Sequence, residues 1–231
     1  MGDVPDSHPR YSSLMSRQRL VDAAAKGLLA DSALIAHGRG EAFDYLLNEA
    51  TCEAASEAIV EVAKRLRAAE RPILSLNGNT SVLAGDVMIA CAAVLGCSLE
   101  VNIYYRTPER MIALLNHLNS VREDAKKLLP ESICERVDEV SILGAKPDGM
   151  IPNLDGPRAS CHSEGILTAD VILVPLEDGD RCEALISMGK TVCVIDLNPL
   201  SRTAQMASVT IVDELTRCAP QLLNALIRKT P

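Results

Sequence analysis

From residue 72 onward, short apolar runs alternate with segments of helical periodicity, and this alternation limits the possible folds more than any other feature. Six of the runs have the length and composition typical of strands, at residues 72–76, 98–105, 137–143, 170–176, 191–197 and 208–212. Helices fit at about 82–95, 108–118, 180–188 and 214–228. This order predicts an α/β protein with a Rossmann-like three-layer fold and a mostly parallel sheet.

The first 70 residues carry helical periodicity without strands, so we expect an additional helical N-terminal part. Its helices are predicted at residues 14–29, 41–47 and 52–69, with a turn at the glycine-flanked Arg39 of HGRG. Charged helical sequence and then Gly-, Pro- and Asp-rich sequence occupy residues 118–157, which we interpret as an excursion from the sheet. We predict a single domain over residues 1–231, whose Rossmann-like part covers 71–231.

The core has to be aliphatic, because only 2% of the 231 residues are aromatic and tryptophan is absent. Such a core suits helices packed on a parallel sheet. The 31 acidic residues outnumber the 23 lysines and arginines, which argues against a nucleic-acid partner, since phosphate contacts need a basic face. Small anionic ligands stay open, because a few placed arginines bind them whatever the net charge.

The eight cysteines include no C-x-x-C pair, so their spacing indicates neither a zinc site nor a disulfide framework. Several lie inside apolar runs, where cysteine acts as a small hydrophobic residue. Cys161 and His162 resemble a nucleophile and its base, but the side chains of adjacent residues usually point apart. We therefore expect reduced, structural thiols.

The sequence predicts neither a signal peptide nor a membrane span. The N-terminal MGDVPDSHPR lacks a basic segment followed by an apolar one, and no run of about 18 uncharged apolar residues occurs. We expect a cytoplasmic protein without a membrane partner.

A polar group follows almost every predicted strand. These groups are NGNT at 77–80, YRTPER at 105–110, EDGDR at 177–181, DLNPLSRT at 196–203, and Asp213-Glu214. Parallel α/β sheets bind their ligands at the carboxyl ends of the strands. We therefore expect the functional site at this edge of the sheet.

The segment DLNPLSRT favours a nucleotide site. Asp196 ends an apolar strand, where a carboxylate can accept hydrogen bonds from ribose hydroxyls. Arg202 follows closely and can bind phosphate oxygens through two parallel hydrogen bonds. Asp213 and Glu214 end the next strand at the same edge. The alternative interpretation is a capped turn with a solvated arginine.

Three further segments have a functional and a structural interpretation. NGNT can present backbone N–H groups to an anion at a helix N-terminus, or it is an ordinary turn capped by Thr80. In EDGDR, Asp178 and Asp180 can hold Mg²⁺ or an ammonium group, or Asp180 caps a helix. HGRG leaves Arg39 accessible to a ligand, but it matches neither the dinucleotide fingerprint nor the Walker A motif.

Seven motifs occur in a fixed order from about residue 8 to residue 220: HPRYSSL, SRQRLVD, AHGRGEAFDYLL, LNGNT, YYRTPER, VPLEDGDRCEAL and IDLNPLSRTAQMASVTIVD. Together they resemble the archaeal 4-phosphopantoate–β-alanine ligases, also called phosphopantothenate synthetases. The sequence departs from that family between about residues 117 and 146, where its helical stretch is longer.

The resemblance implies a homodimer of archaeal coenzyme A biosynthesis. It implies an ATP-dependent ligation of 4-phosphopantoate with β-alanine that releases AMP and pyrophosphate. By their positions in the motifs, the residues implied to bind ATP are Arg17, Arg39, Asp196, Leu197, Asn198, Arg202, Thr203, Glu214 and Leu215.

Such a ligation activates a carboxylate as an acyl-adenylate, which the amine of β-alanine then attacks. It needs no covalent nucleophile of the enzyme, so we expect catalysis from alignment and from charge stabilisation by Arg202 and Mg²⁺. No residue is assigned as a metal ligand. The candidates for binding the acidic substrate, including its phosphate, are Asn77, Asn79, Thr80, Arg106, Asp178 and Asp180.

Two other functions would use the same nucleotide. A small-molecule kinase would release ADP in place of AMP, and the missing Walker A motif counts against it. A non-catalytic nucleotide-binding module would bind ATP without turnover.

Overall fold

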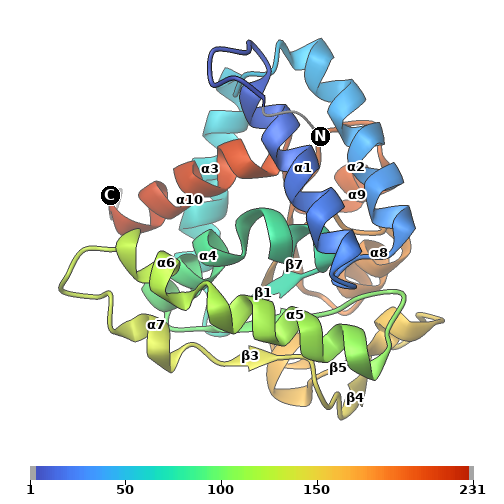
Figure 1. Ribbon diagram of the computed structural model, residues 1–231. Coiled ribbons are helices and arrows are strands. Elements are labelled where there is room, and N and C mark those ends of the chain that lie inside the picture. Colours follow the sequence, from blue (N-terminus) through green and yellow to red (C-terminus); the bar gives the residue numbers. More distant parts are fainter. Residues whose placement is uncertain (1–3, 229–231) are drawn as a thin grey trace.

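The computed structural model describes residues 4–228, and within them six parallel strands form one sheet in the order β3-β2-β1-β6-β7-β8 (Figure 1). The strands are β1 Pro72–Leu76, β2 Ser98–Val101, β3 Ile142–Leu143, β6 Val171–Pro175, β7 Thr191–Ile195 and β8 Val209–Ile211. All five pairings between neighbours are parallel. The predicted Rossmann-like three-layer class is confirmed.

Helices cover both faces of this sheet. They are α1 Tyr11–Ala25, α2 Asp31–Asp44, α3 Glu53–Ala68, α4 Gly78–Leu95, α5 Pro108–Ser120, α6 Arg122–Lys127, α7 Arg136–Glu139, α8 Gly179–Ser187, α9 Arg202–Met206 and α10 Leu215–Ile227. On one face, α3, α4 and α10 form the larger apolar core with the sheet. On the other face, α8 packs with residues of the excursion in a smaller core.

The central strands are buried on both faces, because successive side chains of a strand point to opposite sides. In β1, Leu74 enters the larger core and Ile73 the smaller one. In β6, Leu173 enters the larger core and Ile172 the smaller one. Burial on both faces gives the strands their continuous apolar sequence, which is why the strands could be predicted.

Helix α4 is apolar on all sides because it lies between the sheet and the helices α1, α5 and α10. By length and composition alone it could cross a membrane, but 78% of it is buried inside the protein. It is therefore the central core helix. It starts at Gly78, four residues before the predicted start at residue 82.

The predicted turn at HGRG is wrong, because residues 37–40 lie inside the continuous helix α2. A glycine inside a helix costs only about 1 kcal/mol relative to alanine, which tertiary packing can offset. A β-carbon on Gly40 would lie 3.5 Å from Leu197, so α2 approaches the loop after β7 closely. The division of the chain at residue 70 stays a prediction, and its limits at residues 1 and 231 lie outside the described residues.

The excursion between β2 and β6 differs most from the prediction. Residues 137–143 begin in helix α7 and contribute only two residues to the sheet. Strand β2 ends at Val101, and the side chain of the following Asn102 donates to the carbonyls of Arg158 and Ser160, at 3.2 and 2.9 Å. The excursion also contains the short helices η2 Pro157–Ala159 and η3 Ser163–Leu167 and the antiparallel strands β4 Gly149–Met150 and β5 Ser160–Cys161.

The observed helix cap agrees with the one predicted from the sequence at α5 and differs from the predicted one at α4 and α8. Thr107 caps α5 through its side chain, and Pro108 is the first helical residue. At α4 the capping side chain is Asn77, and Thr80 donates the capped N–H. Asp180 lies within the first turn of α8 and does not cap it.

Candidate active site

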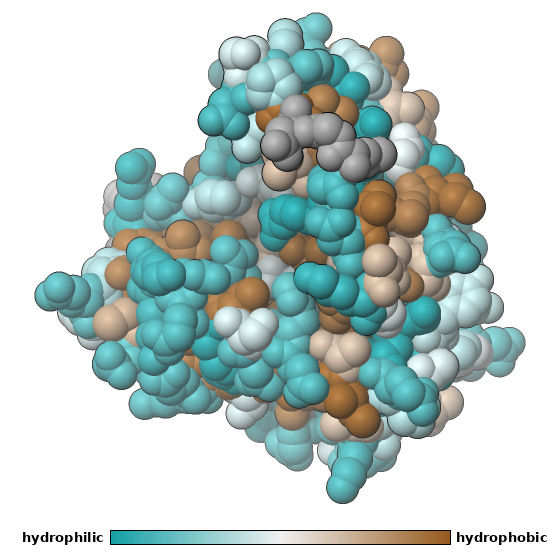
Figure 2. Space-filling view, in the orientation of Figure 1, coloured by the Kyte–Doolittle hydropathy of each residue, from teal (hydrophilic) through white to brown (hydrophobic). Residues whose placement is uncertain are grey.

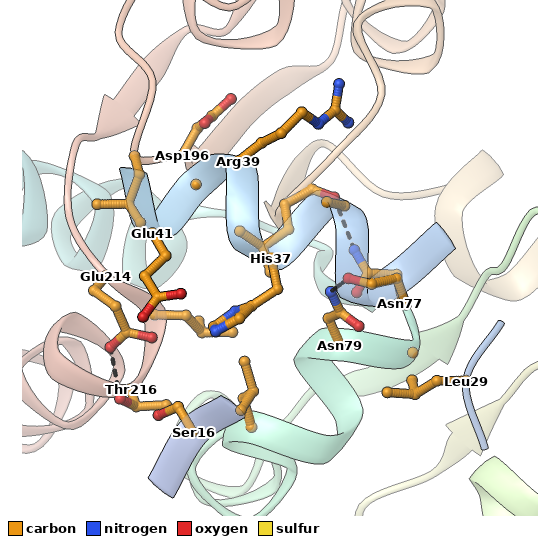
Figure 3. Close-up of a pocket in the computed structure, with 18 of the residues that line it drawn as sticks. Ser16, Leu29, His37, Arg39, Glu41, Asn77, Asn79, Asp196, Glu214 and Thr216 are labelled. Carbon is orange, nitrogen blue, oxygen red and sulfur yellow. Dashed lines mark hydrogen bonds between the residues drawn. The ribbon is translucent and has the colours of Figure 1, made fainter. Parts of the chain in front are cut away.

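An open cleft of about 960 Å³ lies at the carboxyl edge of the sheet, where residues of α1 and α2 form part of its wall (Figure 3). The segments that follow β1, β2, β6, β7 and β8 all contribute to its lining. These strand ends meet because the strands run parallel, as the sequence predicted.

The strand order reverses between β1 and β6, and the cleft lies at this switch point. The side chain of Asn77 joins the two strand ends, since its Nδ2 donates to the carbonyls of Pro175 and Leu176 at 3.1 and 2.8 Å. Leu176 has a φ of 56°, a left-handed conformation that branched L-residues rarely adopt. Strained backbone of this kind is held by its surroundings, and here Asn77 contributes to holding it.

Three helices of the core begin at the cleft. Gly78 of α4, Asp178 before α8 and Leu215 of α10 all belong to its lining. The first N–H groups of a helix lack intrahelical partners, and the helix dipole is positive at this end. The cleft is therefore suited to bind anions.

The segment after β7 is fixed by its own side chains. The carboxylate of Asp196 accepts hydrogen bonds from the backbone N–H of Asn198, at 2.9 Å, and from the hydroxyl of Ser201. The side chain of Asn198 in turn accepts from the N–H of Leu200 at 2.9 Å. These bonds place Asp196, Asn198 and Ser201 in the lining of the cleft.

Arg217 of α10 ties α2 to the edge of the sheet. Its guanidinium donates to Asp44 at the end of α2 at 2.7 Å, and its Nε donates to Asp213 after β8 at 2.8 Å. Both carboxylates are almost fully buried. The hydroxyl of Thr51 donates to the second oxygen of Asp213 at 2.6 Å.

Arg158, Glu177 and Arg181 form a cluster that we call the buried triad. Arg158 lies 2.8 Å from one carboxylate oxygen of Glu177 and 3.1 Å from the other, to which Arg181 also donates. Their side chains are 9%, 0% and 1% exposed, and burial lowers the pKa of Arg181. Nη1 of Arg158 also donates to Asp178 at 2.8 Å, so the two guanidinium groups face two carboxylates. Arg158 and Glu177 line the cleft.

Glu41 holds α2 against α1. Its carboxylate accepts hydrogen bonds from Arg10 at 2.8 Å, from Ser13 at 2.6 Å and from Arg17 at 2.8 Å. Burial by itself would raise the pKa of Glu41, but these three donors lower it below the ordinary value. The cleft therefore has an ionised carboxylate on α2.

Three side chains of the cleft carry a buried polar atom without a hydrogen-bond partner among residues 4–228: His37 Nε2, Asn79 Oδ1 and Arg110 Nε. Burial lowers the pKa of His37 below 6.5, although Glu41 and Glu214 act in the opposite direction. A buried polar group without a partner costs about 1–3 kcal/mol. These atoms are available to hydrogen-bond with a molecule that binds in the cleft.

Comparison with known proteins identifies the family. The model of the family described as phosphopantothenate/pantothenate synthetase matches residues 54–230. A Thermococcus kodakarensis protein named 4-phosphopantoate–β-alanine ligase is 44% identical over 97% of this chain and 80% of its own length. Proteins of the same name from Thermococcus onnurineus and Methanosarcina mazei are 45% and 42% identical over 96% and 94% of this chain, and over 79% of each relative. The chain belongs to the phosphopantothenate synthetase family.

Most of the site residues that we predicted from the sequence are found in the lining of the cleft of this member of the phosphopantothenate synthetase family. Thr203 is buried and donates its hydroxyl to the carbonyl of Glu177 at 2.7 Å, so it also fixes the end of β6. The roles of these residues in binding stay predictions. The predicted residues in the lining are Arg39, Asn77, Asn79, Asp178, Asp196, Leu197, Asn198, Thr203, Glu214 and Leu215.

Three predicted residues lie outside the lining and are engaged by their own chain. Arg17 donates two hydrogen bonds to Glu41. Thr80 is fully buried, and its hydroxyl is 3.4 Å from the carbonyl of Pro175. Arg106 donates to the carbonyl of Gly144 in the excursion, and burial lowers its pKa.

Arg202 and Asp180 also lie outside the lining, where they pair with each other. Arg202 donates to Asp180 and to Glu183 of α8, and its side chain is 59% exposed. Its aliphatic part packs on Gly179, since a β-carbon there would lie only 2.8 Å from Cγ of Arg202. Ser201 and Thr203 on either side line the cleft, so Arg202 lies at its rim.

Sequence analysis missed several residues of the site. His37 belongs to HGRG, but the predicted turn hid its helical relation to Glu41, one turn later. Arg110 belongs to YYRTPER, where only Arg106 was selected. Arg158 comes from the excursion, where no motif indicated a function.

None of the eight cysteines belongs to the lining of the cleft. All eight are free, and burial raises the pKa of the Cys161 thiol to about 11. The ring of His162 accepts a hydrogen bond from the N–H of Gly144 at 3.1 Å. Neither residue belongs to the lining, and a protonated thiol is a poor nucleophile.

Proposed function

We propose that this chain catalyses the ATP-dependent ligation of 4-phosphopantoate and β-alanine to 4′-phosphopantothenate, a step of coenzyme A biosynthesis. The reaction passes through an acyl-adenylate and releases AMP and pyrophosphate. The observation that carries the proposal is the similarity, over 97% of this chain, to a relative named for this ligation. The cleft supports it independently, because the N-termini of α4, α8 and α10 converge there.

In the first step, the carboxylate of 4-phosphopantoate attacks the α-phosphorus of ATP, and pyrophosphate leaves. Arg39 on α2 is exposed and has no ion pair among the described residues, so it is available for a phosphate. Arg202 at the rim can exchange its acidic partners for the polyphosphate. We assign the nucleotide to Arg17, Arg39, Asp196, Leu197, Asn198, Arg202, Thr203, Glu214 and Leu215.

The phosphate and carboxylate of 4-phosphopantoate need cationic or N–H partners. We assign them to Asn77 and the backbone N–H groups at the start of α4, together with Arg110 and Arg158 of the lining. The side chains of Thr80, Arg106 and Asp180 have partners within the chain, and they support these segments from outside the lining.

We further propose that Mg²⁺ enters with ATP. Within residues 4–228 no group of three or more His, Cys, Asp or Glu side chains could hold a metal ion. Mg²⁺ in phosphoryl-transfer sites is commonly bound by one or two carboxylates plus substrate phosphates. The carboxylate of Asp178 pairs with Arg158 at 2.8 Å but is 60% exposed, so we assign it this role together with the phosphates of ATP. When bound, the ion neutralises charge on the polyphosphate.

We propose a cytoplasmic homodimer as the working form. Its eight unpaired cysteines fit a reducing compartment. Ile35 of α2 and Leu46 after it are 67% and 76% exposed, and Figure 2 shows apolar surface where α2 lies. Light scattering after size-exclusion chromatography tests the dimer, and a monomer at all concentrations would contradict it.

Product analysis tests the proposed reaction. The protein is incubated with ATP, Mg²⁺, 4-phosphopantoate and β-alanine, and the nucleotides are separated. We expect AMP and pyrophosphate only when 4-phosphopantoate is present, and amide only when β-alanine is added. ADP as the stoichiometric product would identify a kinase, and ATP binding without turnover would identify a binding module.

A further inference from the structure

Two polar atoms of the cleft can accept a hydrogen bond and have no hydrogen-bond partner among the described residues. They are Oδ1 of Asn79, in the first turn of α4, and Nε2 of His37 on α2. Asn79 is 8% exposed. An acceptor cannot bind the oxygens of a phosphate, so Oδ1 of Asn79 requires a ligand that donates hydrogen bonds.

The two residues are held next to each other. Nδ2 of Asn79 donates to the carbonyl of Ala33 at 3.0 Å, which fixes Oδ1 as the free atom of the amide. Ala33 precedes His37 by one turn of α2, so Asn79 lies against the face of α2 that carries His37. Figure 3 shows His37 between Asn79 on one side and Glu41 and Glu214 on the other.

Helix α2 separates this place from Arg39 and Asp196 of the proposed nucleotide site, whereas Glu214 of that site lies on the side of His37 (Figure 3). His37 and Arg39 are two residues apart and therefore about 200° apart around the helix axis. Figure 3 shows Arg39 beside Asp196 on one side of α2, and His37 with Glu41 on the other. A second ligand on the side of His37 would thus adjoin the nucleotide at Glu214 without competing with it for Arg39 and Asp196.

The charges around His37 favour a cation. Glu41 faces it from α2, Glu214 from the segment before α10, and Arg17 from α1. Arg10 and Arg17 both donate to Glu41, whereas Glu214 accepts only from Thr216 and the N–H of Arg217 and has no ion pair among residues 4–228. Burial nevertheless keeps the imidazole neutral at neutral pH, so Nε2 can accept a hydrogen bond or a proton when Nδ1 carries the ring hydrogen.

We propose that Nε2 of His37 and Oδ1 of Asn79 form the subsite for the ammonium group of β-alanine, and that His37 removes the proton that makes this group a nucleophile. The inference rests on the proposed ligase function and assigns the second substrate to a part of the cleft. The carboxylate of Glu214 attracts the ammonium group to the subsite.

The proposed step balances as follows. The ammonium group gives one proton to Nε2 of His37, and its nitrogen lone pair then attacks the carbonyl carbon of the acyl-adenylate. The C–N bond forms, the tetrahedral adduct loses a second N–H proton to solvent, and the C–O bond breaks with its electron pair leaving on AMP. The imidazolium finally returns its proton to solvent. Carboxylate activation needs neither residue.

The test separates the two half-reactions in a His37→Gln variant. Exchange of pyrophosphate into ATP, dependent on 4-phosphopantoate, reports adenylation and is expected to be unchanged. Amide formation with β-alanine is expected to fall by about 10²-fold or more, the usual contribution of a positioned base. Hydroxylamine, which is mostly unprotonated at neutral pH, needs no base and is expected to trap the acyl-adenylate equally in variant and wild type.

Two further variants sharpen the test. Asn79→Ala is expected to raise the KM for β-alanine while pyrophosphate exchange continues. His117→Gln is the matched control, because His117 of α5 also has a pKa lowered by burial but lies outside the cleft, and this variant is expected to behave as wild type. In the wild type, amide formation is expected to fall as the pH drops through the lowered pKa of His37, and His37→Gln should lose this dependence.

Equal loss of pyrophosphate exchange and amide formation in His37→Gln would overturn the inference, because the residue would then serve adenylation or the fold. Normal amide formation in that variant would overturn it as well. Absence of exchange in the wild type would instead refute the proposed ligase function itself.

Discussion

Two clusters of one kind, arginine with carboxylate, lie close together after β6 and differ in almost every physical property. The buried triad of Arg158, Glu177 and Arg181 is at most 9% exposed, and its Arg158 also pairs with Asp178. The second cluster, which we call the exposed triad, joins Arg202 to Asp180 and Glu183, with side chains 59%, 72% and 44% exposed. Both draw on the single segment EDGDR and the helix that follows it.

The comparison teaches that burial, and not residue type, decides what such a cluster does. Removing one partner of a buried ion pair leaves a charge without compensation in a poorly solvated place, whereas water replaces the partner of an exposed one. The buried triad therefore fixes Arg158 at the cleft. The exposed triad leaves Arg202 free to exchange partners.

The largest expected effect comes from Glu177→Gln. This change leaves the buried Arg181 without a bonded anion and leaves Arg158 with Asp178 alone, so the free energy of unfolding should fall by about 3–5 kcal/mol. Urea denaturation monitored by circular dichroism measures it. Glu183→Gln, the matched change in the exposed triad, should leave the denaturation midpoint almost unchanged. Equal effects of the two changes would abolish the distinction between the triads.

Arg202→Ala should lower the rate of the reaction strongly and leave the stability of the fold almost unchanged. We expect the thermal midpoint to stay near that of the wild type, because the ion pairs of Arg202 are exposed. If the guanidinium stabilises the polyphosphate during adenylation, the rate should fall on the order of 10²-fold, with Arg202→Lys in between.

The control for Arg202 is Arg65→Ala on α3, which removes another exposed pair, with Glu61, far from the cleft lining. Steady-state kinetics and pyrophosphate exchange on the three variants provide the comparison. Wild-type kinetics in Arg202→Ala would show that the exposed triad is structural only, and would withdraw Arg202 from the nucleotide site.

The smallest expected effect concerns a buried acid that has no arginine bonded to it. Glu100 of β2 accepts the backbone N–H groups of His162 and Ile166, both at 3.0 Å, and burial raises its pKa. Because the folded-state pKa lies above the unfolded value of 4.5, the protein loses stability as the pH rises from 4.5 through the raised pKa.

One such proton changes the free energy of unfolding by at most about 1.4 kcal/mol per pH unit. Glu100→Gln should remove this contribution, so the difference between variant and wild-type stability curves should grow as the pH rises through that window. A difference curve that is flat with pH would show that burial does not perturb Glu100.

Local sequence predicted the parts of the fold that repeat, and failed where contacts between distant segments decide. Strands such as 191–197 were readable because each residue is buried on one face or the other. The strand predicted at 137–143 was not, since its edge position gives only Ile142 and Leu143 a partner in β2. The turn expected at HGRG is a helix because α2 packs on the segment after β7.

The sequence predicted that the candidate site lies at the carboxyl edge of the sheet and which motifs contribute to it. It did not predict which side chains face one another in the site. Asp196 and Arg39 were found because polar groups after strands and the family motifs indicated them. Arg158 was not found, because its partners Glu177 and Asn102 are 19 and 56 residues away in the chain.

The sequence by itself determined the alternation of strands and helices, and with it the parallel sheet whose polar edge carries the cleft. It did so because hydrophobic periodicity is a property of neighbouring residues, and each period permits one kind of backbone. Only the tertiary structure decided which arginine is buried and which is solvated, and that His37 and Asn79 share one place without partners. Those properties depend on which distant segments exclude water from a side chain, and no local pattern records that.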